Sequence, residues 1–464
     1  MSTVDVAVIG GGIAGLLAAR TEVLAGHSVV LLEADDRVGG ALAGVALADV
    51  EADVGAESFA SRGSAVATLV RILGLEQVAP SREGAWLLRG TEAHPLPAAG
   101  VLGIPGSPLA DDVRAIIGIR GSLRAYADRL IPELTIGREK NLAALVRRRM
   151  GEAVLDDLVR PVVESVYGLR PEDAEIDALL PGLNSALTAT GSLSSAVLQL
   201  RAAAPAGSAV AGVAGGMHRI AAALAADLAR FEVDVRTRCP ALSVGHRHEG
   251  WRVRTADDVV DADRLVIATG GGAARDLLRP ILTEAVGPES VWPSARTSLV
   301  VSLAIDGVSA LDAAPRGSGV LVAGSADGAT ALTHSSAKWP WLRAALPPQR
   351  HVLRVGYRGA DEVEIAQAVA DAGRLLGVTI PPSAVVDAAR TRWRQDAARA
   401  TTGLPLRLAT LQAAVAATPE LAVMGAWIAG TGLASVVAHS QAESARLAAG
   451  AHRSGPSTDS STDS

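Results

Sequence analysis

The sequence of 464 residues has one cysteine, two lysines and few aromatic residues. The single cysteine, Cys239, excludes an intramolecular disulfide and fits a reducing compartment, so we expect a cytoplasmic protein and a buried thiol. The two lysines, Lys140 and Lys338, leave nearly all positive charge to arginine, and the formal net charge is −6. This balance gives no basic footprint for nucleic acid, and we expect no nucleic-acid partner.

Patterns for secretion, membrane crossing and metal binding are also absent. The N-terminus enters an apolar run without a basic region or cleavage site, so no secretory signal is expected. No apolar run of about 18 residues is free of charges, glycine and proline, so we expect no transmembrane segment, while peripheral membrane contact stays open. His246 and His248 lie in a stretch typical of a hairpin tip, and the histidines lack metal-ligand spacing. The sequence therefore predicts no metal site.

The strongest motif lies in the first forty residues. An apolar run over 4–9 leads into Gly10, Gly12 and Gly15, and a second run over 29–32 ends at Glu33. In G-x-G-x-x-G the first glycine permits a tight turn, the second lets a pyrophosphate approach the backbone, and the third lets the helix pack against the strand. An acid at the spacing of Glu33 accepts hydrogen bonds from a ribose and repels a 2′-phosphate. The sequence predicts a dinucleotide-binding fold whose ligand is not of the NADP type.

The rest of the chain alternates between helical and strand patterns. Residues 64–205 show mainly the three- and four-residue spacing of helices, and the arginine run 147–149 is expected on a solvated helix face. Strands are predicted over 233–236, 250–255, 264–269, 298–305 and 421–427. A helix is predicted from about residue 430 to 449, and the polar tail 453–464 is predicted to be disordered.

These segments together resemble the FAD-dependent porphyrinogen oxidases of heme biosynthesis, which oxidise coproporphyrinogen III or protoporphyrinogen and belong to the amine-oxidase-like flavoproteins. The resemblance covers nearly all of 4–450. Segments 55–58 and 161–168 are more particular to the porphyrinogen oxidases. Ala426 stands where amine oxidases usually have an acid, which favours the porphyrinogen oxidases over them. Other segments that carry the resemblance are 10–15 with Glu33, 37–40, 69–75, 215–217, Gly425 and 430–433.

The resemblance implies an α/β fold with a Rossmann-like FAD-binding domain built from discontinuous segments, a mixed α+β substrate domain and a helical domain. The implied FAD-binding segments are 1–75, 208–285 and 418–452. The helical domain would cover 76–207, and the substrate-binding sheet domain would cover 286–417.

The resemblance also implies roles for single residues. The glycine motif would hold the FAD pyrophosphate and Glu33 the adenosine ribose, while 55–57 would lie beside the flavin ring. Arg62 is the candidate contact for a substrate propionate, because arginine forks suit carboxylates, and a plain surface arginine is the equal alternative. The implied cofactor-binding residues are Gly10, Gly12, Ile13, Ala14, Gly15, Glu33, Ala34, Arg37, Gly39, Gly40, Gly55, Ala56, Glu57, Ser58, Ala241, Gly425, Gly432 and Leu433.

The implied reaction is the oxygen-dependent conversion of coproporphyrinogen III to coproporphyrin III by three two-electron transfers to FAD. Molecular oxygen and, by pathway analogy, a ferrochelatase that takes up the product are the implied partners. Gly63, where a second basic residue is frequent, and 394–399, which follow Trp393, depart from the family pattern. These departures keep three alternatives open: a protoporphyrinogen IX oxidase, another amine-oxidase-like oxidase or desaturase, and a non-catalytic FAD-binding protein.

Overall fold

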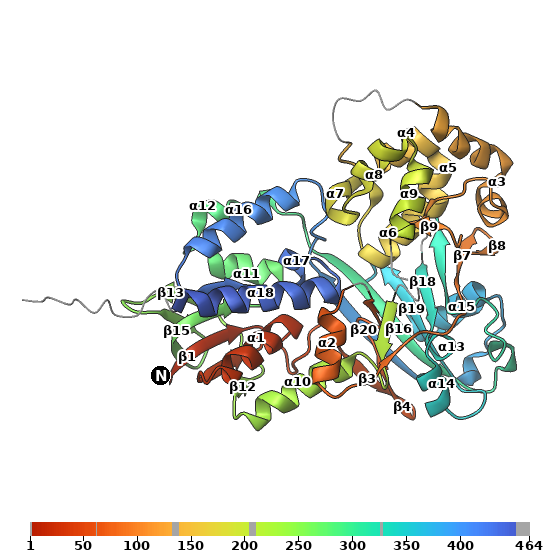
Figure 1. Ribbon diagram of the computed structural model, residues 1–464. Coiled ribbons are helices and arrows are strands. Elements are labelled where there is room, and N and C mark those ends of the chain that lie inside the picture. The colour runs from red at the N-terminus through yellow and green to blue at the C-terminus, as the bar shows by residue number, and fades with distance from the viewer. Residues whose placement is uncertain (1, 62, 132–138, 204–209, 325–327, 452–464) are drawn as a thin grey trace, which may run out of the picture. The chain divides into compact units, whose positions relative to one another are not determined.

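The computed structural model describes residues 2–61, 63–131, 139–203, 210–324 and 328–451 (Figure 1). Arg62, the candidate propionate contact, and the tail 453–464 lie outside the described residues. The chain divides into two compact units. The first is built from 1–42, 220–291 and 406–464, and the second from 43–219 and 292–405. The domain boundaries given above stay a prediction.

A parallel sheet forms the centre of the first unit. Strand β1 (Ser2–Ile9) pairs in parallel with β15 (Val259–Ile267) and β2 (Val29–Leu32). Strand β12 (Asp234–Arg236) extends the sheet beside β2, and β21 (Leu421–Val423) extends it beside β15. The run from Val6 to Ile9 is at most 2% exposed, as expected for a parallel strand that is covered on both faces.

Helices and a hairpin complete this unit. Helix α1 (Ile13–Leu24) follows β1 and packs against α18 (Leu433–Ala451), and both run along the same side of the sheet (Figure 1). Helix α11 (Gly271–Leu278) follows β15. Strands β13 (Ser243–His246) and β14 (Trp251–Arg254) form an antiparallel hairpin with His248 in its turn, so the predicted hairpin tip is confirmed.

The second unit contains a seven-stranded sheet with two unlike faces. One face carries Leu353, Val355 and Tyr357, which are at most 3% exposed and belong to a core that includes helix α15 (Ile365–Leu376). On the same strand Arg354 and Arg358 alternate with these residues and are only partly buried. The strand order is β20 (Val385–Gln395), β16 (Arg296–Ile305), β19 (His351–Arg358), β18 (Ala329–His334), β17 (Gly319–Ala323), β7 (Ala85–Arg89) and β8 (Glu92–Pro95).

The register places residues of β16, β19 and β20 opposite one another on the partly open face. Ser298 of β16 lies opposite both Arg358 of β19 and Trp393 of β20. Ser302 of β16 lies opposite Arg354 of β19. Because successive side chains of a strand point to opposite faces, these residues share the face that does not carry the α15 core.

A helical core forms the other part of the second unit (Figure 1). Its larger members are α3 (Asp111–Tyr126), α4 (Leu142–Met150), α6 (Arg160–Tyr167), α8 (Leu183–Thr190) and α9 (Leu193–Ala202). A π-helical turn, η2 (Leu155–Val159), leads directly into α6. Among the described residues, no helix has both the length and the apolar character that crossing a membrane requires.

The arginine run on α4 is only partly solvated. Arg147 and Arg148 are about half exposed, as predicted, but the Arg149 side chain is 2% exposed. Its Nε donates to Asp128 Oδ1 at 2.5 Å, and its other nitrogens donate to the carbonyls of Ile131 and Gly191. The prediction was wrong for Arg149 because its charge is balanced inside the core, by a carboxylate that sequence periodicity does not reveal.

Three further local predictions differ from the structure. Trp427 lies in helix α17 (Ala426–Ala429) and not in a strand, because Gly425 turns the chain after β21 with a φ of +128°. Cys239 is half-buried, since it lies on the connection between β12 and β13 and not in a core element. Strands β7 and β8 interrupt the mainly helical stretch and pair into the second sheet.

Candidate functional site

The glycine motif forms the turn between β1 and α1. Gly10 has a φ of +103°, and a Cβ on this residue would lie 2.7 Å from the carbonyl oxygen of Ala268. A Cβ on Gly15 would lie 1.9 Å from the carbonyl oxygen of Gly10, so the third glycine lets α1 approach the turn. A Cβ on Gly12 would meet no described atom within 4 Å. The space over Gly12 is therefore open to a ligand, as the second glycine of the motif requires.

The N-terminus of α1 offers unpaired backbone donors to this space. Gly12 is the N-cap, no side chain caps the helix, and the first turn contains no acid. The first N–H groups of a helix have no intrahelical acceptor, and the helix dipole favours an anion there. Ile13 and Ala14 belong to this first turn. This end of α1 suits a pyrophosphate.

Glu33 lies beside the glycine turn. Its Oε2 accepts a hydrogen bond from the Gly11 N–H at 2.5 Å, and its Oε1 accepts one from the Asp35 N–H at 2.8 Å. The Glu33 N–H donates to the Arg236 carbonyl, and the Glu33 carbonyl accepts from the Cys239 N–H. Ala241 follows two residues after Cys239. Ala34 follows on the surface. A carboxylate fixed at the end of β2 stands where this fold binds a ribose hydroxyl.

Residues 37–40 lie against the same turn. The Gly39 N–H donates to the Gly11 carbonyl at 2.8 Å, and a Cβ on Gly40 would come within 3.2 Å of the Gly12 Cα. Arg37 is exposed, and its guanidinium donates to the carbonyl of Gly40. The structure therefore brings these predicted residues together with Gly12.

The last predicted residues of the first unit stand at the start of two helices. A Cβ on Gly425, the N-cap of α17, would lie 3.3 Å from the Thr269 carbonyl oxygen. Gly432 directly precedes α18, and its carbonyl accepts from the N–H groups of Ser435 and Val436. Leu433, the first residue of α18, is 9% exposed.

In the second unit, Glu57 is held by four donors. Its side chain is 10% exposed. Its Oε1 accepts from Ser335 Oγ at 2.8 Å and from Trp339 Nε1 at 3.1 Å. Its Oε2 lies 3.2 Å from Lys338 Nζ and 3.3 Å from Arg354 Nη1. Burial raises the pKa of Glu57, but the two cations and the hydrogen bonds outweigh burial and lower that pKa to about 2. Glu57 is therefore ionised, and both of its oxygens are occupied.

The backbone of the same loop is fixed from the sheet. Arg354 Nη2 donates to the Gly55 carbonyl at 2.8 Å, and Trp393 Nε1 donates to the Val54 carbonyl at 2.9 Å. Gly55, Ala56, Glu57 and Ser58 are all partly buried. Lys338 and Arg354 were not among the predicted site residues. Alternation along β19 could have placed Arg354 on a partly open face, but no motif marks Lys338.

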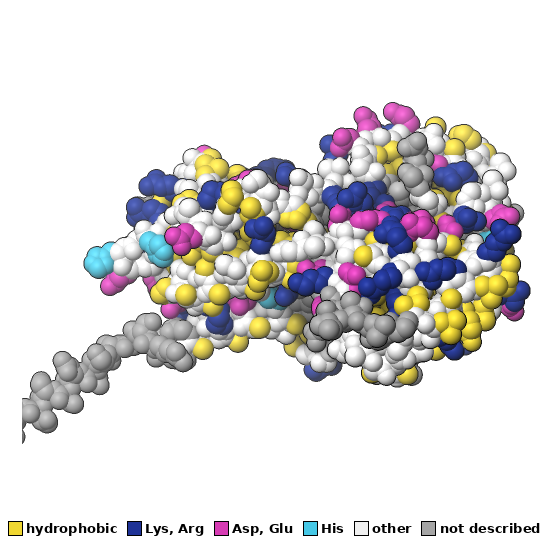
Figure 2. All heavy atoms as spheres, turned by 90° about the horizontal axis from the view of Figure 1, so that it is seen from above, with side chains coloured by type: hydrophobic (Ala, Val, Ile, Leu, Met, Phe, Trp, Pro, Cys, Tyr) yellow, Lys and Arg dark blue, Asp and Glu magenta, His cyan; other side chains and the backbone are white. Residues whose placement is uncertain are grey.

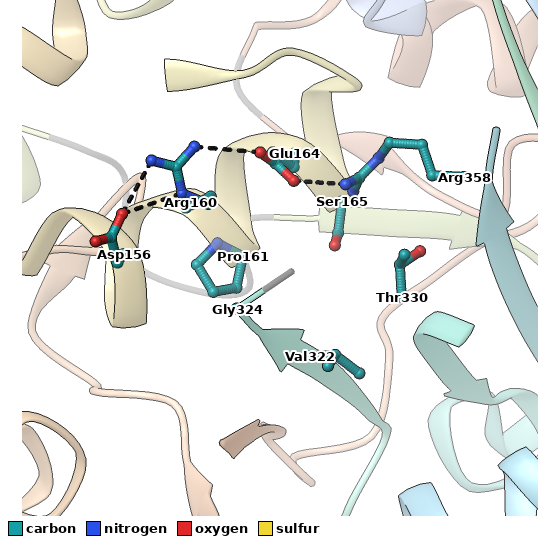
Figure 3. Close-up of a pocket in the computed structure, with 9 residues that line it drawn as sticks. All are labelled: Asp156, Arg160, Pro161, Glu164, Ser165, Val322, Gly324, Thr330 and Arg358. Carbon is teal, nitrogen blue, oxygen red and sulfur yellow. Dashed lines mark hydrogen bonds and ion pairs between the residues drawn. The ribbon is translucent and has the colours of Figure 1, made fainter. Parts of the chain in front are cut away.

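A pocket with a volume of about 510 Å³ lies between α6 and the strands of the second sheet (Figure 3). The α6 side belongs to the segment that carries part of the family resemblance, whereas Arg358 comes from β19 and was not predicted. The lining residues are Asp156, Arg160, Pro161, Glu164, Ser165, Val322, Gly324, Thr330 and Arg358.

Two arginines and their carboxylate partners form one side of this pocket. Glu164 joins them, with Oε2 at 2.5 Å from Arg358 Nη1 and Oε1 at 3.5 Å from Arg160 Nη1 (Figure 3). Arg160 also donates to Asp156 at 2.9 Å and to Glu172 at 2.6 Å. The hydrogen bonds with Glu172 raise the pKa of Arg160 and lower that of Glu172.

The parallel sheet, the glycine turn and Glu33 define a dinucleotide-binding protein of the Rossmann type. Residues 13–451 match the family of flavin containing amine oxidoreductases, and the chain belongs to this family of FAD-dependent oxidoreductases. FAD is the family's cofactor. The open space over Gly12, the uncapped N-terminus of α1 and the fixed Glu33 carboxylate fit the ADP part of FAD.

Relatives that share nearly the whole length of the chain carry one name. The coproporphyrinogen III oxidase of Propionibacterium freudenreichii subsp. freudenreichii is 28% identical, over 98% of this chain and 93% of its own. The coproporphyrinogen III oxidase of Mycobacterium tuberculosis (strain ATCC 25618 / H37Rv) is 30% identical, over 93% of this chain and 94% of its own. The resemblance to the porphyrinogen oxidases is thereby confirmed.

Solved structures share the fold. A crystal structure from Exiguobacterium sp. 255-15, described as a protoporphyrinogen oxidase, aligns with a TM-score of 0.80 and 22% identity, over 96% of this chain and 99% of that one. The cyclohexylamine oxidase of Brevibacterium oxydans IH-35A aligns with a TM-score of 0.67 and 18% identity, over 97% and 100%. The predicted α/β fold of an FAD enzyme is confirmed.

Proposed function

We propose that this protein oxidises coproporphyrinogen III to coproporphyrin III, with molecular oxygen as the final electron acceptor. The observation that carries the proposal is the similarity, over more than nine-tenths of the chain, to relatives of that name. The pocket beside α6 supports it, because its lining includes arginine side chains as well as the apolar Pro161 and Val322. Such a lining suits a flat apolar ring that carries carboxylate arms.

The overall chemistry removes six electrons. In each of three steps a bridging methylene loses a hydride and a pyrrole N–H loses a proton, and the three steps reduce three molecules of oxygen to hydrogen peroxide. FAD supplies the hydride acceptor for each step. The protein supplies binding and orientation.

The residues of this chain divide that work. The turn at Gly10–Gly15 and Glu33 would bind the ADP part of FAD through backbone donors and a carboxylate. Glu57 would fix the loop 55–58 through Lys338 and Arg354, and this loop is expected to lie beside the flavin ring. A cytoplasmic location and a ferrochelatase as recipient of the product belong to the same proposal and rest on the single cysteine and on pathway analogy.

Aerobic turnover of the purified yellow protein tests the proposal. Coproporphyrinogen III and protoporphyrinogen IX are supplied side by side, and porphyrin fluorescence and peroxide are measured, with a protein-free mixture as the control for autoxidation. We expect a preference for coproporphyrinogen III and three molecules of peroxide for each porphyrin formed. A preference for protoporphyrinogen IX would move the protein to the alternative substrate. No porphyrin from either, with FAD bound, would refute the proposal and direct attention to amines and polyenes.

A further inference from the structure

Arg358 presents hydrogen-bond donors to the pocket that no described residue of the protein accepts. Its Nη1 donates to Glu164 Oε2, and its side chain is 32% exposed. Within the described ranges, Nε and Nη2 of Arg358 have no acceptor. A guanidinium has five N–H groups in a fork that matches a carboxylate, so most of this fork is available.

The neighbouring arginine is different. Arg160 donates through Nε and Nη2 to Asp156, and through Nη1 and Nη2 to Glu172. All three of its nitrogens are therefore engaged by the protein. Of the two arginines that line the pocket, Arg358 is the one that can donate to another carboxylate without losing its present contacts.

A hydroxyl lies on the same pocket lining. Ser165 follows Glu164 on α6, and in the part of the chain that the structure describes its Oγ has no hydrogen-bond partner. Ser165 and Arg358 both line this pocket (Figure 3). Pro161 lies one turn earlier on the same helix, and Val322 lies on the sheet side, so the polar pair is accompanied by apolar surface.

We propose that Arg358 and Ser165 form a subsite for one carboxylate arm of the ligand, while the ring packs on Pro161 and Val322. This inference rests on the proposed function, in which the arm is a propionate of the porphyrinogen. The contact with Glu164 already shows that the Arg358 guanidinium binds a carboxylate at this position.

Glu164 allows a test of the subsite, because its charge repels an incoming carboxylate and its Oε2 occupies Nη1 of Arg358. Glu164→Gln keeps the shape of the side chain and removes the charge. If Arg358 binds a ligand carboxylate, this variant should bind the ligand more tightly. If the pair serves only to tie α6 to β19, loss of the ion pair should weaken binding or leave it unchanged.

The test is a fluorescence titration of the FAD-loaded protein with coproporphyrin III, the stable product with four carboxylates. We expect Arg358→Gln to raise the dissociation constant about 10- to 100-fold, since a charge-assisted hydrogen-bond pair is lost. Arg358→Lys keeps the charge but not the fork and should lie between. Glu164→Gln should lower the constant several-fold. Arg392→Gln is the matched control, because Arg392 lies on β20 of the same sheet, is exposed, and donates to the Asp361 carbonyl instead.

Circular dichroism and flavin absorbance establish that each variant is folded and loaded, and Arg358→Lys replaces Arg358→Gln if the latter does not fold. If the unaltered protein binds coproporphyrin III and both Arg358 variants bind it with the same dissociation constant, the subsite is overturned and the proposed function stands. Weaker or unchanged binding in Glu164→Gln would also overturn it. Failure of the unaltered protein to bind coproporphyrin III would overturn the subsite alone, and failure to turn over coproporphyrinogen III would overturn both.

Discussion

Acid should destabilise the second unit through a buried histidine pair on the core face of its sheet. His334 is 0% exposed and His351 is 2% exposed. His334 Nε2 lies 3.1 Å from His351 Nδ1, and His351 Nε2 lies 3.1 Å from Asp312 Oδ1. The carboxylate accepts, so His351 carries its proton on Nε2 and accepts from His334 Nε2–H through Nδ1. His334 Nδ1 is then a bare acceptor, and it has no partner among the described residues.

This arrangement holds His334 neutral. Burial lowers the pKa of His334 to about 3, and the neighbouring His351 and Arg343 add to the effect. In the unfolded chain a histidine has a pKa of about 6.5. The folded pKa is therefore the lower one, so the unfolded state binds more protons as the pH falls below 6.5. The stability that neutral His334 contributes is complete above pH 6.5 and is lost progressively down to about pH 3.

The size of the effect follows from the shift. At pH 5 the unfolded histidine is about 1.5 pH units below its pKa while the folded one is still neutral, and each unit is worth about 1.4 kcal/mol. His334 alone should cost about 2 kcal/mol at pH 5 relative to pH 7.5. Burial also lowers the pKa of His351, which acts in the same direction.

Urea unfolding at pH 7.5 and pH 5, followed by circular dichroism, measures the difference. His334→Gln keeps an N–H donor for His351 Nδ1 but cannot titrate, so we expect its free energy of unfolding to fall by about 2 kcal/mol less than that of the unaltered protein. His248→Gln, in the exposed turn between β13 and β14, is the matched control and should follow the unaltered protein. An identical acid sensitivity of His334→Gln and the unaltered protein would refute the reasoning.

Four other substitutions have expected outcomes. Arg149→Met leaves the buried Asp128 carboxylate without its partner and should lower the free energy of unfolding by about 3–5 kcal/mol, measured by urea denaturation; a loss below 1 kcal/mol would contradict this account. Gly12→Ala fits the protein but fills the space over the turn, so the flavin absorbance per protein should fall while the melting temperature of the apoprotein stays unchanged. Gly15→Ala should lower both the flavin absorbance and the melting temperature, because its Cβ would contact Gly10. Glu57→Gln leaves two cations beside a neutral amide and should cost about 3 kcal/mol in thermal or urea unfolding, and a neutral effect would show that the cluster does not hold the loop.

The nucleotide-binding part of the fold could be predicted because its information is local. The geometry of one turn requires Gly10 and Gly15, Gly12 leaves the space over that turn open, and β1, α1 and β2 follow within thirty-two residues of the start. Each step depends on an apolar period or on a glycine, and both can be seen in the chain. The same holds for the hairpin around His248 and for the long helix after Gly432.

The pocket could not be predicted in the same way, because its partners are far apart in the sequence. Arg358 meets Glu164 across 194 residues, and Glu57 meets Lys338 across 281. Which strand positions face the pocket depends on the register of β19 between β16 and β18, and a shift of one residue would exchange Arg358 for Tyr357. Arg149 shows the same limit on a helix, since only the buried Asp128 explains why the third arginine of a run leaves the solvent.

Glu57 makes contacts within the protein that its sequence segment does not predict. Its segment was predicted to lie beside the cofactor, and a glutamate in such a segment suggests a direct contact. In the structure both carboxylate oxygens accept hydrogen bonds from the protein, so the side chain has no free oxygen to offer a ligand without losing one of them. The part of the loop that a cofactor could contact is therefore the backbone of Gly55, Ala56 and Ser58, which Arg354 and Trp393 hold through the carbonyls of Gly55 and Val54. The charge of Glu57 therefore acts within the protein, by fixing the loop through Lys338 and Arg354.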